Sequence, residues 1–308
     1  MTHPGSTGES GEEAGQETGE GGARAAAPGQ QKMTSFEQIY DRPDPRDFFR
    51  DLGRWEYQTP HHAQGVFRRL AAARTRADGG GPLAVLDICC SYGINAALLN
   101  HDLTLEELSA HYTSPQAAAL TTAELIERDR AYFAARRRPD AVRMIGLDRA
   151  ANAIGYALAV GLLDEGFAED LEEDPPGAAL LKAAQTVGLI TVTGGASFLS
   201  PRTFRPLLSA AHREVWVAAF VLRTGCYQSI ADGLTPFGLV TEKAEAPTYR
   251  QRRFTSAQEQ QHAVDAVTAL GEDPRGKESD GYYHTAFHLS RPAHDAAALP
   301  LPALLREA

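Results

Sequence analysis

The stretch Leu83–Leu99, LAVLDICCSYGINAALL, decides the fold. A short apolar run ends at Asp87, a turn of small residues follows, and the chain resumes after Gly93 as a segment rich in Ala and Leu. A buried strand followed by a tight turn and a helix is the opening unit of nucleotide-binding α/β domains. The stretch therefore predicts a strand, a ligand-facing turn and a helix within an α/β fold.

The same stretch resembles the first motif of the class I S-adenosylmethionine-dependent methyltransferases, in which an acidic residue ends the first strand and a D-x-G-x-G-x-G turn follows. Asp87 and Gly93 match that pattern, while Cys89 and Ser91 replace the two earlier glycines. The resemblance implies a Rossmann-like seven-stranded methyltransferase sheet in the order 3-2-1-4-5-7-6, with the last strand antiparallel. It also implies S-adenosyl-L-methionine as cofactor, bound at this turn.

The replaced glycines bear on which ligand the turn accepts. A dinucleotide pyrophosphate presses against bare backbone at the helix N-terminus, and the side chains of Cys89 and Ser91 would obstruct it. S-adenosylmethionine has no phosphate, so small side chains are tolerable beside it, and NAD and FAD are disfavoured. The Asp87 carboxylate is suited to receive the ligand's ammonium group, directly or through water. The alternative is a buried strand-to-helix corner without a ligand.

Composition places the chain among ordinary globular proteins. Its 308 residues are 43% hydrophobic and 23% charged, with a net charge of −10 and three cysteines. No apolar run approaches a membrane span, and no signal peptide is evident, so we expect a cytoplasmic protein. The cysteines and histidines show neither a disulfide framework nor the spacing of a metal site. The acidic balance makes a nucleic-acid substrate unlikely and favours a small-molecule substrate; the sequence does not determine the oligomeric state.

The N-terminal part of the chain divides in two. Residues 1–32 are rich in Gly, Glu, Ser and Ala and predict a disordered tail. Residues 33–78 combine helical spacing with aromatic residues, among them Tyr40, Trp55 and Tyr57. Their helical extension is expected to form a lid over the cofactor; the alternative is ordinary packing outside the core. Residues 79–292 are expected to form the cofactor-binding domain, followed by a C-terminal tail over residues 293–308.

Residues 100–140 predict a helical insertion, because capping boxes begin at Thr104 and Thr121. The second strand follows as Val142–Asp148. The usual interval from the acidic residue of the turn to the one that ends the second strand is about 20 residues. The interval from Asp87 to Asp148 is much longer, and the insertion accounts for the excess. The resemblance implies that Asp148 holds both ribose hydroxyls of the cofactor. The alternative is an exposed N-cap for the next helix.

The segment after the third strand, GFAEDL at residues 166–171, is the expected adenine site. In the resembling family an acidic residue accepts the adenine amino group there and the next backbone amide donates to the ring, which implies roles for Asp170 and Leu171. Glu169, Glu172 and Glu173 compete for the acidic role, and a plain solvated turn is the alternative.

Gly188–Ser200, GLITVTGGASFLS, predicts a buried central strand that opens into a glycine turn. The resemblance places this end against the cofactor's sulfonium, so Thr193 is a candidate cofactor contact, and Ser197 and Phe198 are candidate substrate contacts. An Asn/Asp-Pro-Pro-Tyr type motif is absent from the stretch, which argues against amide or nucleobase N-methylation of that kind.

Three further strands are expected at Val215–Leu222, Leu239–Ala244 and Tyr282–Leu289, which gives seven strands in total. A helix is expected between the last two, capped by Ser256 and ended by Gly271.

Methyl transfer to a small molecule is the function that these features favour. The activated methyl group needs alignment and exclusion of water, and an oxygen nucleophile also needs a base. Candidate catalytic residues are His61 and its neighbour His62, together with Tyr57 and Tyr227. Arg223 is a candidate clamp for a substrate carboxylate or, equally, a structural partner for an acidic residue.

Two other functions are consistent with the same motif. The first is a cyclase or aminocarboxypropyl transferase that consumes S-adenosylmethionine and releases methylthioadenosine, which the altered turn at Cys89 and Ser91 keeps open. The second is a non-catalytic S-adenosylmethionine-binding protein.

Overall fold

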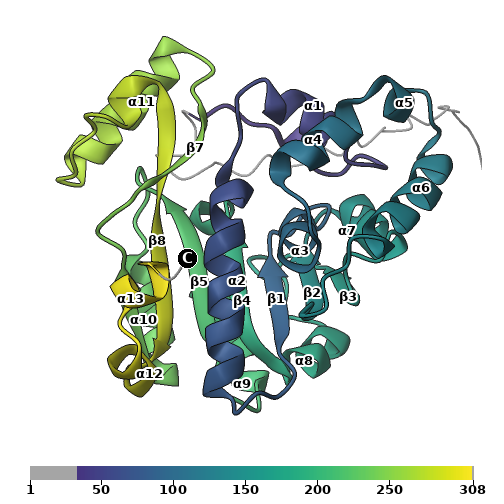
Figure 1. Cartoon of the computed structure of the whole chain (residues 1–308). Helices are drawn as coiled ribbons and strands as arrows, with labels where there is room; N and C mark the ends of the chain where they lie inside the picture. The colour runs from purple at the N-terminus through teal and green to yellow at the C-terminus, as the bar shows by residue number, and fades with distance from the viewer. Residues whose placement is uncertain (1–32, 307–308) are drawn as a thin grey trace, which may run out of the picture.

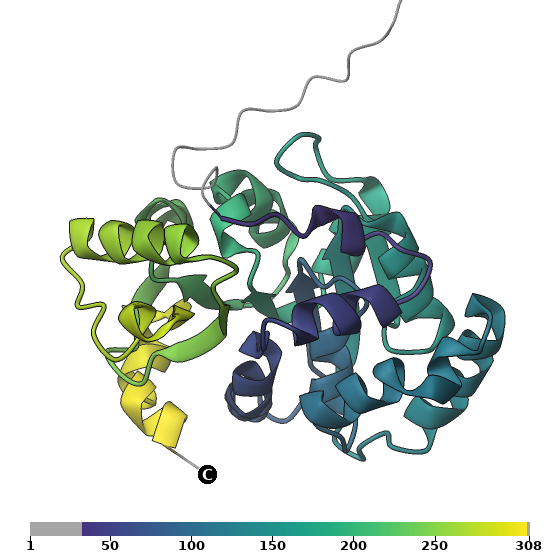
Figure 2. The ribbon, with the colours of Figure 1, turned by 90° about the horizontal axis from the view of Figure 1, so that it is seen from above.

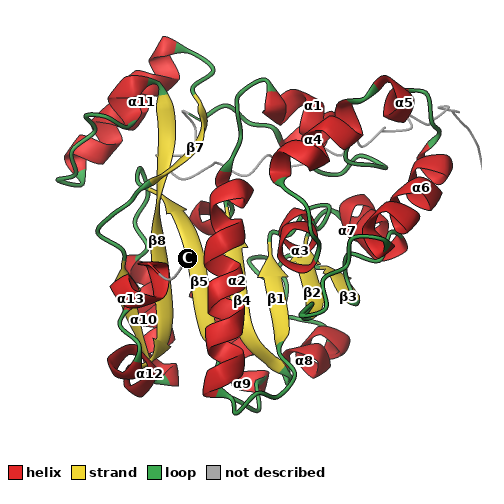
Figure 3. Ribbon diagram, in the orientation of Figure 1, coloured by secondary structure: helices red, strands yellow, loops and turns green. Residues whose placement is uncertain are grey.

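The structure is a computed structural model that describes residues 33–306. An eight-stranded sheet lies at its centre, with helices on both sides (Figures 1 and 3). The strands are β1 (Ala84–Ile88), β2 (Arg143–Asp148), β3 (Glu165–Ala168), β4 (Val187–Thr193), β5 (Trp216–Leu222), β6 (Leu239–Lys243), β7 (Tyr249–Arg253) and β8 (Tyr282–Pro292). The disordered tail expected over residues 1–32 lies outside the described residues.

The strand order confirms the fold class that the first motif predicts. Seven strands follow the order β3-β2-β1-β4-β5-β8-β6, and β8 is antiparallel to both β5 and β6. With β8 counted as the seventh strand, this is the expected order 3-2-1-4-5-7-6. The additional strand β7 pairs with the first residues of β8 and is absent from the sequence prediction.

Both faces of the sheet are buried, because successive side chains of a strand point to opposite sides. In β5, Trp216 and Phe220 belong to one core cluster and Val217 and Val221 to the other. Figure 1 shows α2 in front of the sheet. The first face carries α2 (Thr59–Ala77), α3 (Ile94–Asn100) and α7 (Ala151–Ala159), and the second carries α8 (Ala178–Ala184), α9 (Pro201–Ala210) and α10 (Gln228–Leu234).

The insertion is helical, as its caps predict. Thr104 and Thr121 both form complete capping boxes, at the starts of α4 (Leu105–Thr113) and α6 (Thr122–Ala134). A third, one-turn helix, α5 (Pro115–Ala118), lies between them, where Pro115 follows the Ser114 cap. Ser256 likewise caps α11 (Ala257–Ala269), and Gly271 follows it with a φ of 76°.

The N-terminal segment crosses the edge of the sheet at which the parallel strands end. Its short η1 (Glu37–Ile39) and α1 (Arg46–Gly53) lie above that edge in Figure 1, and Figure 2 shows them from above. Three contacts hold the segment in place. On α7, Asn152 N donates to Asp41 Oδ1 at 2.7 Å, and on α4 the ring of Tyr112 stacks on that of Phe49 with centroids 4.8 Å apart. On β7, Arg253 N donates to the Trp55 carbonyl at 2.7 Å.

The C-terminal segment packs on the core through two short helices, α12 (Ala293–Ala298) and α13 (Leu301–Arg306). Leu301 and Leu304 are buried, and Trp216 Nε1 donates to Asp295 Oδ2 at 2.7 Å. Among the helices of residues 33–306, none combines the length and apolar character needed to cross a bilayer.

Candidate functional site

The turn between β1 and α3 follows a glycine-type backbone path. Cys89, Ser91 and Gly93 have φ values of 57°, 49° and 76°, so every second residue is left-handed. Side chains in this region cost about 1–2 kcal/mol per residue, and isolated non-glycine examples cluster at functional sites. Cys89 and Ser91 therefore adopt the left-handed backbone that glycine favours, at the two positions where the D-x-G-x-G-x-G pattern has glycine.

Ser91→Gly is expected to raise the free energy of unfolding by about 0.5–1 kcal/mol. Glycine relieves the left-handed clash but is more flexible in the unfolded chain, which offsets part of the gain. Denaturant titration of Ser91→Gly and Ser91→Ala measures the effect. Equal stabilisation by alanine would attribute the gain to removal of the hydroxyl and contradict backbone strain as its cause.

Gly93 is required by close packing as well as by its backbone. A Cβ at this position would lie 3.2 Å from Ala157 Cβ and 3.3 Å from Leu162 Cβ. Gly93 is also the N-cap of α3. The third glycine of the motif therefore lets α3 start close against α7 and the residues after it.

Asp87 is wholly buried at the end of β1. Thr191 Oγ1 donates to its Oδ1 at 2.6 Å, and Asn95 Nδ2 lies 3.0 and 3.1 Å from its two carboxylate oxygens. Burial raises the pKa of Asp87 to about 7, although these hydrogen bonds act in the opposite direction. The structure therefore holds the Asp87 carboxylate between Thr191 and Asn95; its predicted role toward the ammonium group of a ligand stays a prediction.

Asp148 ends β2 and fastens the turn. Its Oδ2 accepts from Ser91 N at 2.8 Å, and its Oδ1 accepts from Ala150 N at 2.9 Å. The side chain is only partly buried. Each carboxylate oxygen has a second lone pair, so the group can still accept hydrogen bonds from a ligand beside the turn.

Two buried polar atoms at the turn have no hydrogen-bond partner among the described residues: Ser91 Oγ and Asn95 Oδ1. Asn95 Nδ2 also donates to Thr193 Oγ1 at 2.8 Å, so this side chain links the ends of β1 and β4. Sequence reasoning missed Asn95. Its signal was a polar residue in the first turn of an otherwise Ala- and Leu-rich helix.

Three carboxylates converge on Cys89. Burial raises the pKa of its thiol, and the negative charges of Asp148, Asp87 and Asp170 raise it further. Its Sγ would lie only 2.4 Å from a Cβ at Gly195, so the thiol faces the loop after β4. The negative charges of all three carboxylates predicted at the ends of the first three strands thus act on this one thiol.

The residues around Asp170 have separate partners. Asp170 Oδ1 accepts from Glu172 N at 3.0 Å, and the next residue, Leu171, is buried. Glu169 accepts from Gly177 N at 2.8 Å. Glu172 accepts from the Ser200 and Thr203 hydroxyls at 2.7 and 2.6 Å. Two competing glutamates therefore hold neighbouring loops, whereas the Asp170 carboxylate accepts from its own turn.

The loop after β4 presents the predicted substrate contacts. Ser197 and Phe198 lie in the single turn η2 (Ala196–Phe198), where Ser197 is exposed and the Phe198 side chain is 63% exposed. Tyr57 from the N-terminal segment also reaches this loop, because its Oη would lie 3.0 Å from a Cβ at Gly194.

The other predicted catalytic and substrate residues lie away from the turn. His61 is exposed on α2, and its ring packs against His62 with centroids 5.2 Å apart. Tyr227 is buried after β5, where its ring packs against His288. Arg223 Nη1 donates to Glu278 Oε2 at 2.5 Å, and its Nη2 donates to Glu272 Oε2 at 3.1 Å. These contacts give Arg223 the alternative role, as a partner for acidic residues.

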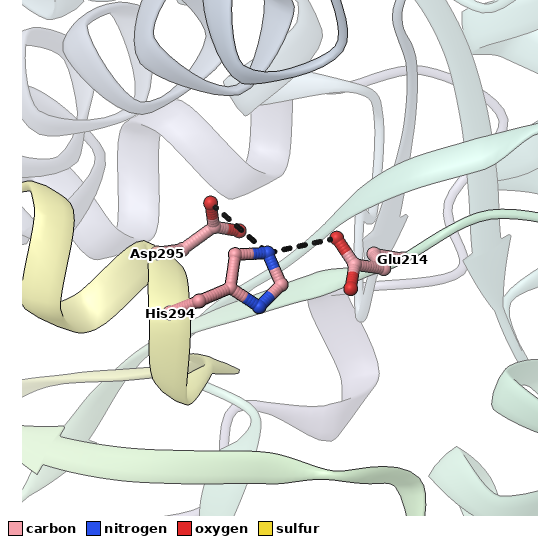
Figure 4. A group of neighbouring side chains, drawn as sticks. All are labelled: Glu214, His294 and Asp295. Carbon is pink, nitrogen blue, oxygen red and sulfur yellow. Dashed lines mark ion pairs between the residues drawn. The ribbon is translucent and has the colours of Figure 1, made fainter.

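A separate cluster of three potential metal ligands lies next to the first residue of β5 (Figure 4). His294 Nε2 lies 3.4 Å from Glu214 Oε2 and 3.7 Å from Asp295 Oδ1. Glu214 and His294 are more than half exposed, and exposed groups of this kind are common without an ion. This end of β5 is opposite to the edge that carries the turn, so the cluster takes no part in the site.

No protein-family model matches the sequence, and the search of curated proteins returned no match. The solved structures that it resembles include magnesium protoporphyrin IX methyltransferase from Synechocystis PCC 6803 with bound SAM. The two chains are 15% identical, and their alignment covers 86% of this chain and 92% of the methyltransferase, with a TM-score of 0.37. A plantazolicin methyltransferase in complex with SAH is 10% identical, with coverages of 83% and 97% and a TM-score of 0.38. Precorrin 8w decarboxylase from Methanobacterium thermoautotrophicum is 15% identical, with coverages of 73% and 89% and a TM-score of 0.34. The sheet order itself gives this chain the class I methyltransferase fold.

Proposed function

We propose that this protein is an S-adenosylmethionine-dependent methyltransferase that acts on a small-molecule acceptor. The observation that carries the proposal is the turn after β1, in which three alternate residues are left-handed and the Asp148 carboxylate binds the Ser91 amide. A ligand site at the carboxyl ends of β1, β2 and β4 is the position expected for an open parallel sheet.

The residues at the turn fit S-adenosylmethionine better than a dinucleotide. Ser91 Oγ and Asn95 Oδ1 are buried polar atoms without partners in the part of the chain that the structure describes, and both are suited to the ligand's polar methionine end. Asp148 would hold the ribose hydroxyls, and Asp170 with the Leu171 amide would hold the adenine. The side chains of Cys89 and Ser91 stand where a pyrophosphate would need bare backbone.

The cofactor would supply an activated methyl group, so this chain's residues have to position the reactants and exclude water. Tyr57, from the N-terminal segment, reaches the loop after β4, and the rings of Tyr40 and Tyr57 both pack against Phe48. Burial raises the pKa of Tyr40 to about 12, and the charges of Arg252 and Asp148 also act on its hydroxyl. Burial likewise raises the pKa of Tyr57. Both phenols therefore keep their protons near pH 7, which makes Tyr57 a hydrogen-bond donor and argues against its predicted role as a base.

Calorimetry tests the ligand class directly. The protein is expected to bind S-adenosylmethionine or adenosylhomocysteine and to show no heat of binding with NAD, because side chains replace the two phosphate-facing glycines. Binding of NAD without binding of either adenosyl ligand would contradict the proposal.

The nucleoside product tests the reaction. Labelled S-adenosylmethionine is incubated with the protein and a cell extract, and the labelled nucleoside is identified. Adenosylhomocysteine is expected, as the product of methyl transfer. Methylthioadenosine would instead indicate transfer or cyclisation of the aminobutyrate arm, and binding without either product would indicate a non-catalytic protein.

Residues 35–58, the part of the expected lid segment 35–73 that precedes α2, are expected to act as a lid over the bound cofactor. Residues 59–73 belong to α2, which packs on the sheet, whereas lids are drawn from the less stable parts of a fold. Hydrogen exchange with adenosylhomocysteine should show added protection across residues 40–63. Protection of the turn at residues 87–93 with unchanged exchange across 40–63 would contradict the lid and would favour an acceptor pocket built by the insertion at residues 100–140.

A further inference from the structure

Three residues other than glycine have a left-handed backbone in the part of the chain that the structure describes. Two of them, Cys89 and Ser91, belong to the turn after β1, and the third is Glu56, with a φ of 52°. Glu56 lies in the N-terminal segment, directly before Tyr57. Isolated residues of this kind cluster at functional sites, where the surrounding contacts offset their cost. Glu56 is therefore the one whose conformation the turn does not explain.

The backbone of Glu56 ends α1 and sets the direction of the chain that follows. Tyr57 N donates to the Leu52 carbonyl at 3.2 Å, and Glu56 N donates to the Gly53 carbonyl at 3.1 Å. These are the two hydrogen bonds of a Schellman motif, whose left-handed position is usually glycine and sometimes asparagine. A glutamate there carries the cost of a left-handed side chain, so other contacts have to hold it.

The side chain of Glu56 makes these contacts with β7 and β8. Tyr282 Oη donates to Glu56 Oε2 at 2.6 Å, and Arg253 Nε lies 2.6 Å from Glu56 Oε1. The hydrogen bond from Tyr282 lowers the pKa of Glu56, so the group is a carboxylate near pH 7. Beside this pair, Gln58 N donates to the Gln251 carbonyl at 2.8 Å. The chain on both sides of Tyr57 is thus held to β7 and β8.

Tyr57 is the residue that these contacts place at the cofactor site. Its Oη would lie 3.0 Å from a Cβ at Gly194, in the loop after β4. The negative charges of Asp87 and Cys89 act on its hydroxyl, and its ring packs edge-on against Phe48 of α1 with centroids 6.2 Å apart. A change of backbone conformation at Glu56 would therefore move the phenol relative to the loop and the turn.

We propose that Glu56 is a positioning residue of the cofactor site. Its left-handed backbone, held by Tyr282 and Arg253, places the Tyr57 phenol beside the loop after β4, where the phenol forms one wall of that site. Glu56 acts through Tyr57 and not on the ligand itself. The inference rests on the proposed function, because the site is the one assigned there to S-adenosylmethionine.

Calorimetry of the full chain with adenosylhomocysteine tests the proposal. Tyr57→Ala is expected to raise the Kd about fivefold or more, because it removes the wall and its hydrogen-bond donor. Glu56→Ala loses the contacts with β7 and β8 and should raise the Kd about threefold or more, whereas Glu56→Gln keeps an acceptor for Tyr282 and should stay within about twofold of wild type. Glu127→Ala is the matched control and should change nothing, since it removes an exposed carboxylate of α6 that pairs with Arg130 at 2.7 Å.

A double-mutant cycle separates positioning from a general structural role. The variant with both Glu56→Ala and Tyr57→Ala should bind adenosylhomocysteine no more weakly than Tyr57→Ala alone, because Glu56 then has no phenol to place. The Glu56 side chain is 48% exposed, so circular dichroism should show its variants folded.

Four results would overturn the proposal: an additive loss in the double variant, an unchanged Kd in Glu56→Ala, equal losses in Glu56→Ala and Glu56→Gln, or a Tyr57→Ala variant that binds as tightly as wild type. Each of them leaves the proposed function standing, because the wild type still binds the ligand. Wild type that binds neither S-adenosylmethionine nor adenosylhomocysteine would overturn the proposed function itself, and this inference with it.

Discussion

Glu259→Gln is expected to lower the free energy of unfolding by about 3 kcal/mol at pH 7. Glu259 and Arg252 are each about 2% exposed at the side chain and form a two-pronged pair, with Arg252 Nη2 to Glu259 Oε1 at 2.8 Å and Arg252 Nη1 to Glu259 Oε2 at 3.2 Å. Thr34 N and Thr255 N donate to the same carboxylate at 2.8 and 2.6 Å. Breaking such a pair leaves an uncompensated buried cation.

The pH dependence of this effect has a defined sign. Burial alone would raise the pKa of Glu259, but the hydrogen bonds from Arg252, Thr255 and Thr34 lower it from 4.5 to about 2. A depressed folded-state pKa stabilises the fold above pH 4.5, and this stabilisation is lost as the pH falls toward 2. At 1.36 kcal/mol per pKa unit, the shift corresponds to about 3 kcal/mol.

Urea titrations of wild type and Glu259→Gln at pH 7 and at pH 3 measure both quantities. The difference in free energy of unfolding should shrink markedly at the lower pH. Glu245→Gln, which alters an exposed glutamate between β6 and β7, is the matched control and should have little effect at either pH. A difference that is unchanged between the two pH values would show that packing, and not the ionised carboxylate, stabilises this contact.

The pair between Glu259 and Arg252 also helps to explain why β7 was not predicted from the sequence. The sequence of β7, YRQRR, has neither apolar alternation nor a high content of β-branched residues. The strand forms because β8 is eleven residues long and offers an additional pairing edge. Arg252 of this strand can be buried because its charge is paired with that of Glu259, which lies on α11. Tertiary pairing of this kind leaves no periodic signal.

The seven other strands and the capped helices were predictable because their signals are local. Buried parallel strands are near-continuous apolar runs, and the capping boxes at Thr104 and Thr121 are short-range patterns. The one-turn helix α5 was missed, since four residues are too few to establish a helical period.

The sequence predicts which residues of the candidate site lie at the ends of the strands, but it does not predict the contacts that these residues make. Asp87 and Asp148 were predicted because the motif resemblance places acidic residues at the ends of the first two strands, and the structure has both residues there. The contact between Asp87 and Thr191 depends on the register of β1 against β4, which the sequence does not encode locally. Likewise, the acidic partners of Arg223 come from the loop after α11, so its role could not be decided before the fold was known.

Asp148→Asn is expected to weaken binding of adenosylhomocysteine tenfold or more. In the proposed function the Asp148 carboxylate accepts both ribose hydroxyls, and hydrogen bonds to charged groups contribute about 1.5–3 kcal/mol each. The same carboxylate also accepts from the Ser91 and Ala150 amides, so Asp148→Ala would leave two backbone donors unpaired and disturb the turn itself. Asparagine keeps one acceptor oxygen for these two amides and removes the charge, so it disturbs the turn less than alanine does.

Asp164→Asn is the matched control for this measurement. Asp164 Oδ2 likewise accepts from a backbone amide of β2, that of Met144 at 2.7 Å, but it does so at the opposite end of the strand. Calorimetry should therefore show an unchanged Kd for adenosylhomocysteine in Asp164→Asn and a Kd at least tenfold higher in Asp148→Asn. Both substitutions remove a carboxylate that accepts from backbone amides. Equal affinities in two folded variants would therefore assign Asp148 to the support of the turn alone and place the ribose elsewhere.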